Sequence, residues 1–105
     1  MEINEIIKEN YTLLNVNGRL DSTTATDFEN SLLKILDVGK ENVVNFEDLK
    51  YISSSGLRVL LVAAKKLGVS GKKLTITAMQ VHIKEVFDIS GFTGLFNIFP
   101  ENPFE

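Results

Sequence analysis

The chain has 105 residues, of which 44% are hydrophobic and 24% are charged, and its formal net charge is −3. This length and composition predict one folded domain over residues 1–105, with a flexible C-terminal tail from about residue 100. The absence of cysteine excludes disulfides and thiolate nucleophiles, and the single histidine, His82, is too little for a zinc centre. We therefore expect neither a metal ion nor a cofactor.

The N-terminal residues and the charge distribution bear on location and partners. The start of the chain does not resemble a signal peptide, and no apolar run approaches the ~18 residues of a membrane span. We expect a cytoplasmic protein with no membrane partner, and the negative net charge argues against nucleic acid. Residues 49–84 nevertheless contain seven basic residues and no acid. This pattern is typical of solvated lysines on helix faces, but its sign favours a phosphate bound nearby.

The first part of the chain predicts a hairpin followed by a helix. Apolar and β-branched residues over 3–7 and 11–16 predict two antiparallel strands, the second ending at residues 17–18, which read Asn-Gly. A helix should follow Asp21 and end before Gly39. The apolar residues of this helix recur every three or four positions and predict one buried stripe of Ala25, Phe28, Leu32, Ile35 and Leu36.

The remaining elements alternate strands with helices. A core helix is expected over residues 57–67, because apolar residues lie on nearly every side of it, and a third helix should end at Gly91. Further strands are expected at 43–46 with a continuation at 51–52, at 73–78 and at 95–99. The pattern predicts an α/β fold in which a mixed sheet of about four to five strands is packed by three or more helices.

Three consecutive serines, Ser53, Ser54 and Ser55, followed by Gly56, lie between a predicted strand and the core helix. The unpaired amides and the dipole of a helix N-terminus favour an anion by about 0.3–1 kcal/mol. Glycine lets a phosphate or another backbone approach closely. A phosphoryl group could therefore be attached here without unfolding the helix. The open alternative is that one serine caps the helix and the others are ordinary turn residues.

Known enzyme motifs do not fit this turn. A nucleophile elbow at Ser54 requires glycine where Ile52 stands, and His82 is the only histidine that could serve as its base. A P-loop requires a lysine after Gly56 and a second glycine at a fixed spacing, and the sequence has neither. His82 follows an apolar residue and precedes another, which is more typical of a partly exposed helix position than of a catalyst.

Asp21 allows two interpretations. It is a suitable helix cap, and it is also suitably placed on a surface loop to face a partner. Strand ends and the helix starts that follow them gather at one rim of an α/β sheet. We therefore expect Asp21 and residues 53–58 to share one contiguous surface.

Residues 45–60, which read Asn-Phe-Glu-Asp-Leu-Lys-Tyr-Ile-Ser-Ser-Ser-Gly-Leu-Arg-Val-Leu, resemble the signature of the STAS domain, specifically that of the bacterial anti-sigma factor antagonists. Residues 83–92 resemble the third-helix segment of the same family. Residues 18–21, Gly-Arg-Leu-Asp, are similar to its turn before the first helix. The resemblance covers essentially the whole chain and implies a STAS-like fold.

The resemblance also implies a function as a small switch protein. Members of this family bind an anti-sigma factor that is itself a serine kinase of the histidine-kinase-like ATPase fold, and this binding frees a sigma factor for transcription. The kinase phosphorylates the antagonist with ATP, and a metal-dependent serine phosphatase restores it. The chain is then a kinase substrate and a binding module rather than an enzyme, and we expect it to be a monomer.

The family pattern Asp-Ser-Ser/Thr-Gly can be carried over residue by residue. Ser54 matches the phosphorylated serine, Ser55 the next hydroxyl and Gly56 the glycine, whereas Ser53 stands where the family has aspartate. This departure bears on how the turn is held and how the kinase orients its acceptor. The implied partner-binding residues are Asp21, Ser53, Ser54, Ser55, Gly56 and Arg58. The alternative function is an unphosphorylated STAS scaffold subunit in a signalling or transporter-associated complex.

Overall fold

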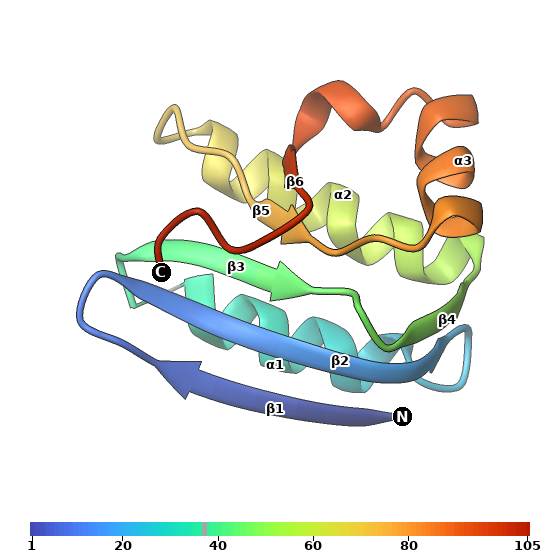
Figure 1. Ribbon diagram of the computed structural model, residues 1–105, viewed down its shortest axis with the longest axis horizontal. Helices are drawn as coiled ribbons and strands as arrows, with labels where there is room; N and C mark the ends of the chain where they lie inside the picture. Colours follow the sequence, from blue (N-terminus) through green and yellow to red (C-terminus); the bar gives the residue numbers. More distant parts are fainter. Residues whose placement is uncertain (37) are drawn as a thin grey trace.

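The computed structural model describes residues 1–36 and 38–105. In this part of the chain a six-stranded mixed sheet has the order β1-β2-β3-β5-β6, with β4 paired to β2 off this path (Figure 1). The elements are β1 (Glu2–Ile7), β2 (Tyr11–Leu20), α1 (Ala25–Leu36), β3 (Glu41–Asn45), β4 (Leu49–Ile52), α2 (Ser54–Gly68), β5 (Thr75–Thr77), α3 (Val81–Ile89), the short 3-10 helix η1 (Thr93–Leu95) and β6 (Asn97–Phe99). The predicted mixed α/β fold is confirmed, with three α-helices in this part of the chain, and the sheet has six strands where about four to five were expected. Among the described residues, no helix has both the length and the hydropathy needed to cross a bilayer.

The strand β2 connects the two parts of the sheet. It pairs antiparallel with β1, parallel with β3 over its first half, and parallel with β4 at its end. The prediction that it ends at residues 17–18 is wrong, because the pairing shifts register between Gly18 and Arg19 and then continues to Leu20. Gly18 has a φ of 116°, a conformation that favours glycine. The Asn-Gly pair therefore forms an irregularity within a strand instead of a turn.

One face of the sheet carries the core. Helices α1 and α2 lie side by side over this face (Figure 1). The predicted stripe of α1 is confirmed, since all five of its residues are buried. The helix ends at Leu36, residue 37 lies outside the described residues, and Gly39 follows with a φ of 83°. The sheet and α2 contribute the facing core residues Leu14, Val16, Val44, Ile76, Val59, Leu60, Ala63 and Leu67.

The C-terminal segment lies on the opposite face of the sheet, where it crosses in front of β3 in Figure 1. The ring of Phe104 stacks on Tyr11, with centroids 6.0 Å apart. The Tyr11 hydroxyl donates a hydrogen bond of 3.2 Å to Glu105 Oε1. Through these contacts, residues 100–105 cover part of the sheet. The expected flexibility of this tail stays a prediction.

Gly56 determines how closely α2 approaches the sheet. A Cβ at this position would lie 2.6 Å from Leu20 Cγ and 3.0 Å from Ile52 Cγ1. Leu20 and Ile52 are both buried, so their side chains have little room to move away. The first turn of α2 can therefore rest against β2 and β4 only because residue 56 has no side chain.

This packing predicts opposite effects for two glycines of the same helix. Gly56→Ala should lower the free energy of unfolding by about 1–3 kcal/mol, because overpacking outweighs the better helix propensity of alanine. Gly68→Ala is the matched control, since nothing lies within 4 Å of the position that its Cβ would take. This control should raise the free energy of unfolding by about 0.5–1 kcal/mol. Urea unfolding of both variants measures the difference, and equal changes of the same sign would contradict the packing argument.

Candidate functional site

The ends of β2 and β4 lie side by side. Leu20 pairs with Ile52, and the Ser53 amide donates a hydrogen bond of 2.9 Å to the Leu20 carbonyl. Asp21 follows Leu20 directly, so Asp21 and Ser53 leave the sheet at the same place. We call this region, residues 19–24 and 51–58, the rim. The expected proximity of Asp21 to the serine turn is present in the structure.

Ser53 occupies the N-cap position of α2 but does not cap it with its side chain. Its φ and ψ of −102° and 176° are extended, and its carbonyl accepts a hydrogen bond of 3.0 Å from the Leu57 amide. Its Oγ is buried and has no hydrogen-bond partner among the described residues. The alternative that a serine hydroxyl caps this helix therefore receives no support from either Ser53 or Ser54, which is already the first residue of the helix.

Ser54 is exposed at the start of α2. Within the described residues, the amides of Ser54, Ser55 and Gly56 have no acceptor, as expected for the first turn of a helix. Arg58 is exposed one turn further along the same face of the helix. An anion on the Ser54 hydroxyl would thus lie close to unpaired donors, the positive end of the helix dipole and a guanidinium group.

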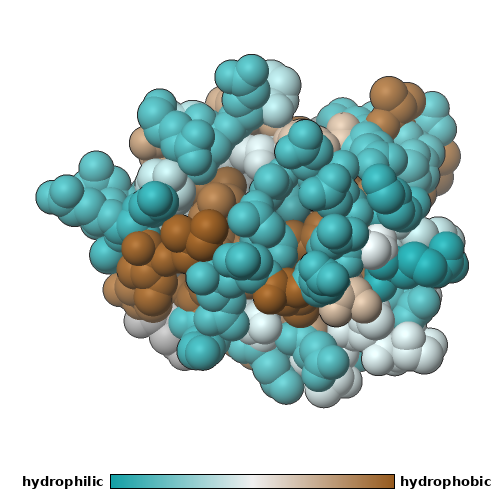
Figure 2. All heavy atoms as spheres, turned by 60° about the horizontal axis from the view of Figure 1, so that its bottom comes forward, coloured by the Kyte–Doolittle hydropathy of each residue, from teal (hydrophilic) through white to brown (hydrophobic). Residues whose placement is uncertain are grey.

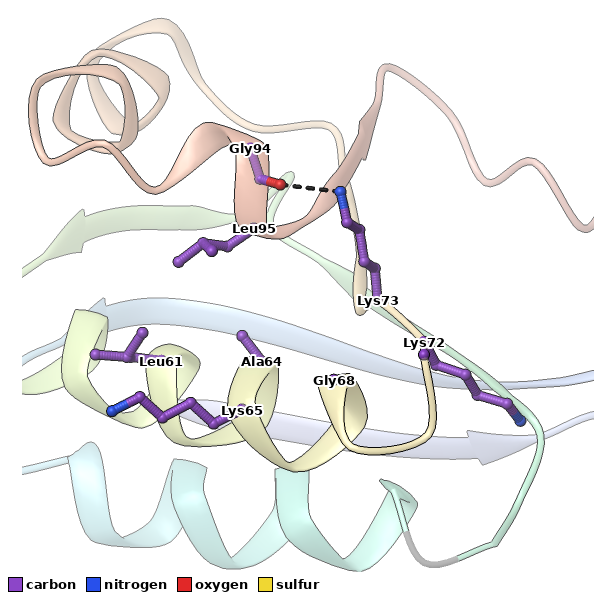
Figure 3. Close-up of a pocket in the computed structure, with 9 residues that line it drawn as sticks. Leu61, Ala64, Lys65, Gly68, Lys72, Lys73, Gly94 and Leu95 are labelled. Carbon is purple, nitrogen blue, oxygen red and sulfur yellow. Dashed lines mark hydrogen bonds between the residues drawn. The ribbon is translucent and has the colours of Figure 1, made fainter.

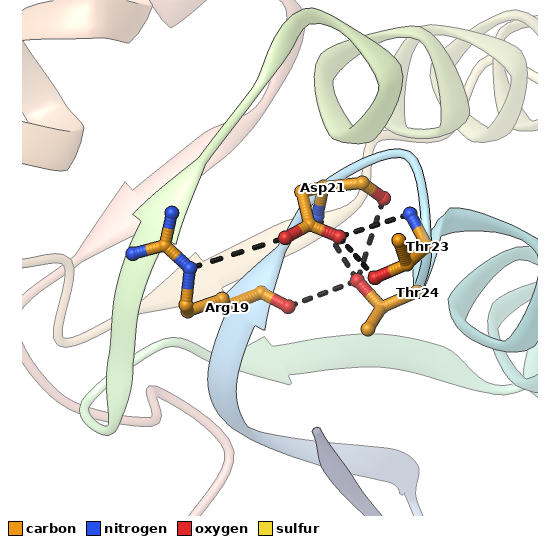
Figure 4. A network of polar contacts seen from close by, with 4 residues as sticks. All are labelled: Arg19, Asp21, Thr23 and Thr24. Atoms are coloured by element: carbon orange, nitrogen blue, oxygen red, sulfur yellow. Dashed lines mark hydrogen bonds and ion pairs between the residues drawn. The ribbon is translucent and has the colours of Figure 1, made fainter.

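A network of polar contacts holds the Asp21 loop (Figure 4). Asp21 Oδ1 accepts hydrogen bonds from the Thr23 amide at 2.9 Å and from the Thr23 hydroxyl at 2.6 Å. The Thr24 hydroxyl donates to the Arg19 carbonyl at 2.9 Å and accepts from the Asp21 amide at 3.0 Å. The interpretation of Asp21 as a helix cap is supported, because its carboxylate accepts from the Thr23 amide while its carbonyl accepts a hydrogen bond of 2.9 Å from the amide of Ala25, the first residue of α1.

The same contacts set the charge of Asp21. The hydrogen bonds from Thr23 lower the pKa of the Asp21 carboxyl, and the Arg19 guanidinium lowers it further. Arg19 Nε lies 3.9 Å from Asp21 Oδ2. Asp21 is therefore held as a carboxylate at neutral pH, and it presents a fixed negative charge on the rim.

Two residues that sequence analysis did not assign to the site, Arg19 and Tyr51, extend the rim over β4. They are register partners, and the Arg19 guanidinium carbon lies 4.3 Å from the centroid of the Tyr51 ring. The pairing of β2 with β4 brings these two side chains together. Their contact could therefore be predicted only with knowledge of that pairing. His82 is exposed on α3, as predicted, and its Nε2 lies 2.7 Å from the Lys50 carbonyl oxygen.

The rim presents the exposed Ser54 next to polar side chains that are already engaged. No group of three or more potential metal-ligating side chains occurs among the described residues. The polar groups next to the serine turn are already engaged, Asp21 with Thr23 and His82 with the Lys50 carbonyl. Ser54, in contrast, is exposed at the first residue of α2 and its hydroxyl binds no partner among the described residues.

Comparison with known proteins identifies the family. Residues 2–102 match the STAS domain family. The chain belongs to the STAS domain family. BtrV of Bordetella bronchiseptica, whose name assigns it to the anti-sigma factor antagonists, is 39% identical over 82 residues, which cover 77% of this chain and 71% of that protein. The resemblance seen in the sequence is therefore confirmed, and this STAS domain belongs with the anti-sigma factor antagonists.

Solved structures confirm the STAS fold. The anti-sigma factor antagonist SpoIIAA in its unphosphorylated form matches with a TM-score of 0.72 at 14% identity, over 96% of this chain and 89% of that one. SpoIIAA of Bacillus in its phosphorylated form matches with a TM-score of 0.70 at 17% identity, over 92% of this chain and 90% of that one. One STAS fold therefore accommodates both forms of that protein.

The Asp21 network makes a prediction about pH. Thr23→Ala removes one of the two hydrogen bonds to Asp21 Oδ1, so it should raise the pKa of Asp21 towards its ordinary value. A lowered pKa in the folded state stabilises the fold above the unfolded-state pKa, and this stabilisation is lost as pH falls through the folded-state pKa. The variant should therefore lose less stability on acidification than the wild type.

Carbon-detected NMR titration of the Asp21 carboxyl measures this pKa directly. Thr26→Ala is the matched control, because Thr26 is exposed in the first turn of α1 and is not among the hydrogen-bond partners of Asp21 in the described residues. Its Asp21 titration should match that of the wild type. An Asp21 pKa in Thr23→Ala that equals the wild-type value would show that these hydrogen bonds do not set the charge of the rim.

Proposed function

We propose that this STAS domain is an anti-sigma factor antagonist that binds a kinase anti-sigma factor through its rim and is released by phosphorylation of Ser54. The observation that carries the proposal is the exposed Ser54 hydroxyl at the first residue of α2. This hydroxyl caps nothing, so its modification removes no contact that holds the fold. Phosphorylation can therefore act on binding while the domain stays folded.

The start of α2 supports a phosphoryl group on Ser54. A phosphoserine carries about −1.5 to −2 charges at neutral pH, and a helix N-terminus is a favourable place for them. The unpaired amides of the first turn can donate hydrogen bonds to the phosphate. Arg58, one turn along, has no ion-pair partner among the described residues and adds a positive charge.

The same phosphate opposes docking of a partner. An unphosphorylated rim offers uncharged hydroxyls beside the Asp21 carboxylate, and such groups can be buried once they are hydrogen-bonded. A dianion holds its hydration strongly and would be left incompletely paired in a contact built for a hydroxyl. A loss of about 3 kcal/mol corresponds to an affinity roughly two decades weaker. Phosphorylation of Ser54 would then release the partner.

The proposed cycle assigns roles to other proteins. The kinase anti-sigma factor transfers a phosphoryl group from ATP to this chain, and a serine phosphatase removes it. The unphosphorylated chain holds the anti-sigma factor and so frees the sigma factor. The chain acts in this cycle as a monomeric cytoplasmic substrate and ligand, not as an enzyme. The phosphorylated and unphosphorylated SpoIIAA structures, which share the fold of this chain, support a cycle without refolding.

The first test of the proposal is the identity of the acceptor. Incubation of the purified chain with ATP and the cognate kinase, sought among proteins encoded beside it, should add one phosphoryl group. Phosphopeptide mapping should place this group on Ser54. Ser54→Ala should fold normally and remain unmodified, because Ser54 is exposed and no hydrogen bond of its hydroxyl is found among the described residues.

Ser53→Ala and Ser55→Ala are the matched controls, since both flank the acceptor and should still be phosphorylated. A label mapped to Ser53 or Ser55 in the wild-type chain would contradict the assignment of Ser54. A label on none of the three serines, with a kinase active on itself or another substrate, would instead favour the unphosphorylated scaffold function.

A further inference from the structure

A hollow lies at the far end of α2 from the rim, between the last turns of this helix, the turn at residues 68–73 and η1 (Figure 3). Its volume is about 470 Å³, which is within the usual range for small-molecule sites. Leu61 and Ala64 of α2 face Leu95 of η1 across it. None of the rim residues lines the hollow, so it is a separate feature of the molecule.

Hydrogen bonds and ring packing fix both walls of the hollow. On the α2 side, the Leu67 carbonyl accepts hydrogen bonds from the amides of Ser70 and Lys72, both at 3.0 Å. On the η1 side, the Leu95 amide donates to the Phe92 carbonyl at 2.9 Å, and the ring of Phe96 packs on Phe87 with centroids 5.7 Å apart. The space is therefore formed by ordered backbone and not by a gap in a loose loop.

Glycines keep this space open. Gly68 and Gly94 both line the hollow, and nothing lies within 4 Å of the position that a Cβ would take on either. Gly68 is helical, so its backbone conformation does not require glycine, and alanine would be the better helix former. Its missing side chain leaves room in the hollow at the expense of helix propensity.

The floor of the hollow is apolar and its edges are basic. Leu95 remains 39% exposed, although it faces Leu61 and Ala64. Lys65 and Lys72 are exposed on opposite sides of the hollow, with their side chains directed away from each other in Figure 3, and neither has an ion-pair partner among the described residues. Lys73 spans the hollow and donates a hydrogen bond of 3.0 Å to the Gly94 carbonyl (Figure 3). Among the described residues, no acidic side chain lines the hollow.

We propose that this hollow binds a small amphipathic anion, of the class of alkyl carboxylates. The alkyl chain would cover Leu61, Ala64 and Leu95, whose apolar surface now faces water. The carboxylate would lie at an edge of the hollow, where the ammonium group of Lys65 or of Lys72 can turn towards it on its flexible stem. This complementarity of an apolar floor and an unpaired basic edge selects an amphipathic anion over a neutral alkane or a short polar anion.

The site is independent of the proposed phosphorylation. Residues of the second half of α2 line the hollow, whereas Ser54 is the first residue of the same helix. Ligand binding should therefore be measurable on the unphosphorylated chain alone. Failure of the ligand test would leave the function of the rim unaffected.

Octanoate is the probe, and the readout is the amide spectrum of the full chain by 15N-edited NMR. We expect a saturable titration with shifts confined to residues 61–73 and 92–96. 1-Octanol, which keeps the chain but lacks the charge, should bind more weakly, and propionate, which keeps the charge but has a short chain, should give no saturable shift. A titration by octanoate that does not saturate, or octanol binding as tight as octanoate, would overturn the proposal.

Gly68→Leu should abolish octanoate binding by filling the hollow, because the structure leaves open space at that Cβ. Val69→Leu is the matched control, since Val69 is 90% exposed and does not line the hollow. It should bind octanoate as the wild type does. Unchanged octanoate shifts in folded Gly68→Leu would place the ligand elsewhere and overturn the proposal.

The double variant Lys65→Gln/Lys72→Gln tests the basic edge without altering the floor. Its affinity for octanoate should fall about threefold to tenfold, while octanol binding stays the same. This variant also tests the proposal by itself if Gly68→Leu does not melt as cooperatively as the wild type and is therefore not properly folded. An octanoate affinity equal to that of the wild type would show that the lysines do not recognise the anion, and would overturn the proposal.

Discussion

The pairing of β2 with two different strands is the constraint on which the rest of the structure depends. The first half of β2 pairs with β3, and its end, beyond the irregularity at Gly18, pairs with β4. Because the Ser53 amide binds the Leu20 carbonyl, the start of α2 is fixed to the end of β2. The buried contact of Gly56 with Leu20 then brings the helix close to the sheet. Ser54 is left outside this contact, on the same surface as Asp21.

Sequence periodicity predicted the parts of the fold that depend on local order. The stripe of α1 was predictable because its apolar residues repeat at helical spacing, and the motif resemblance placed Ser54 at a helix start. The continuation of β2 was not predictable, because Asn-Gly is most often a turn and only the partner strand β4 shows it to be a register shift. The contact of Arg19 with Tyr51 depends on that same long-range register. The bonds of Asp21 to Thr23 and the unpaired Ser53 hydroxyl depend on side-chain conformations, which residue types alone do not determine.

The two ends of α2 differ in their electrostatics. Its N-terminus presents unpaired amides and favours an anion attached to Ser54. Its last turn carries Lys65 and Lys66, which complement the negative end of the helix dipole. Within the basic segment 49–84, Arg58 lies near the rim, whereas Lys65, Lys72 and Lys73 lie around the hollow. The lysines of this segment are largely exposed, as predicted, but Lys73 binds the Gly94 carbonyl and Lys84 pairs with Asp88. Figure 2 shows another face of the molecule, where hydrophilic side chains surround smaller hydrophobic areas.

The central claim is that a phosphoryl group on Ser54 weakens partner binding while the fold is unchanged. Calorimetric titration of the cognate anti-sigma factor with fully phosphorylated and with unphosphorylated chain tests it most directly, together with an amide NMR spectrum of each form. We expect the phosphorylated form to bind about a hundredfold more weakly, with amide shifts confined to the rim. Equal affinity of the two forms, or shifts spread through the core residues of α1 and the sheet, would contradict the claim.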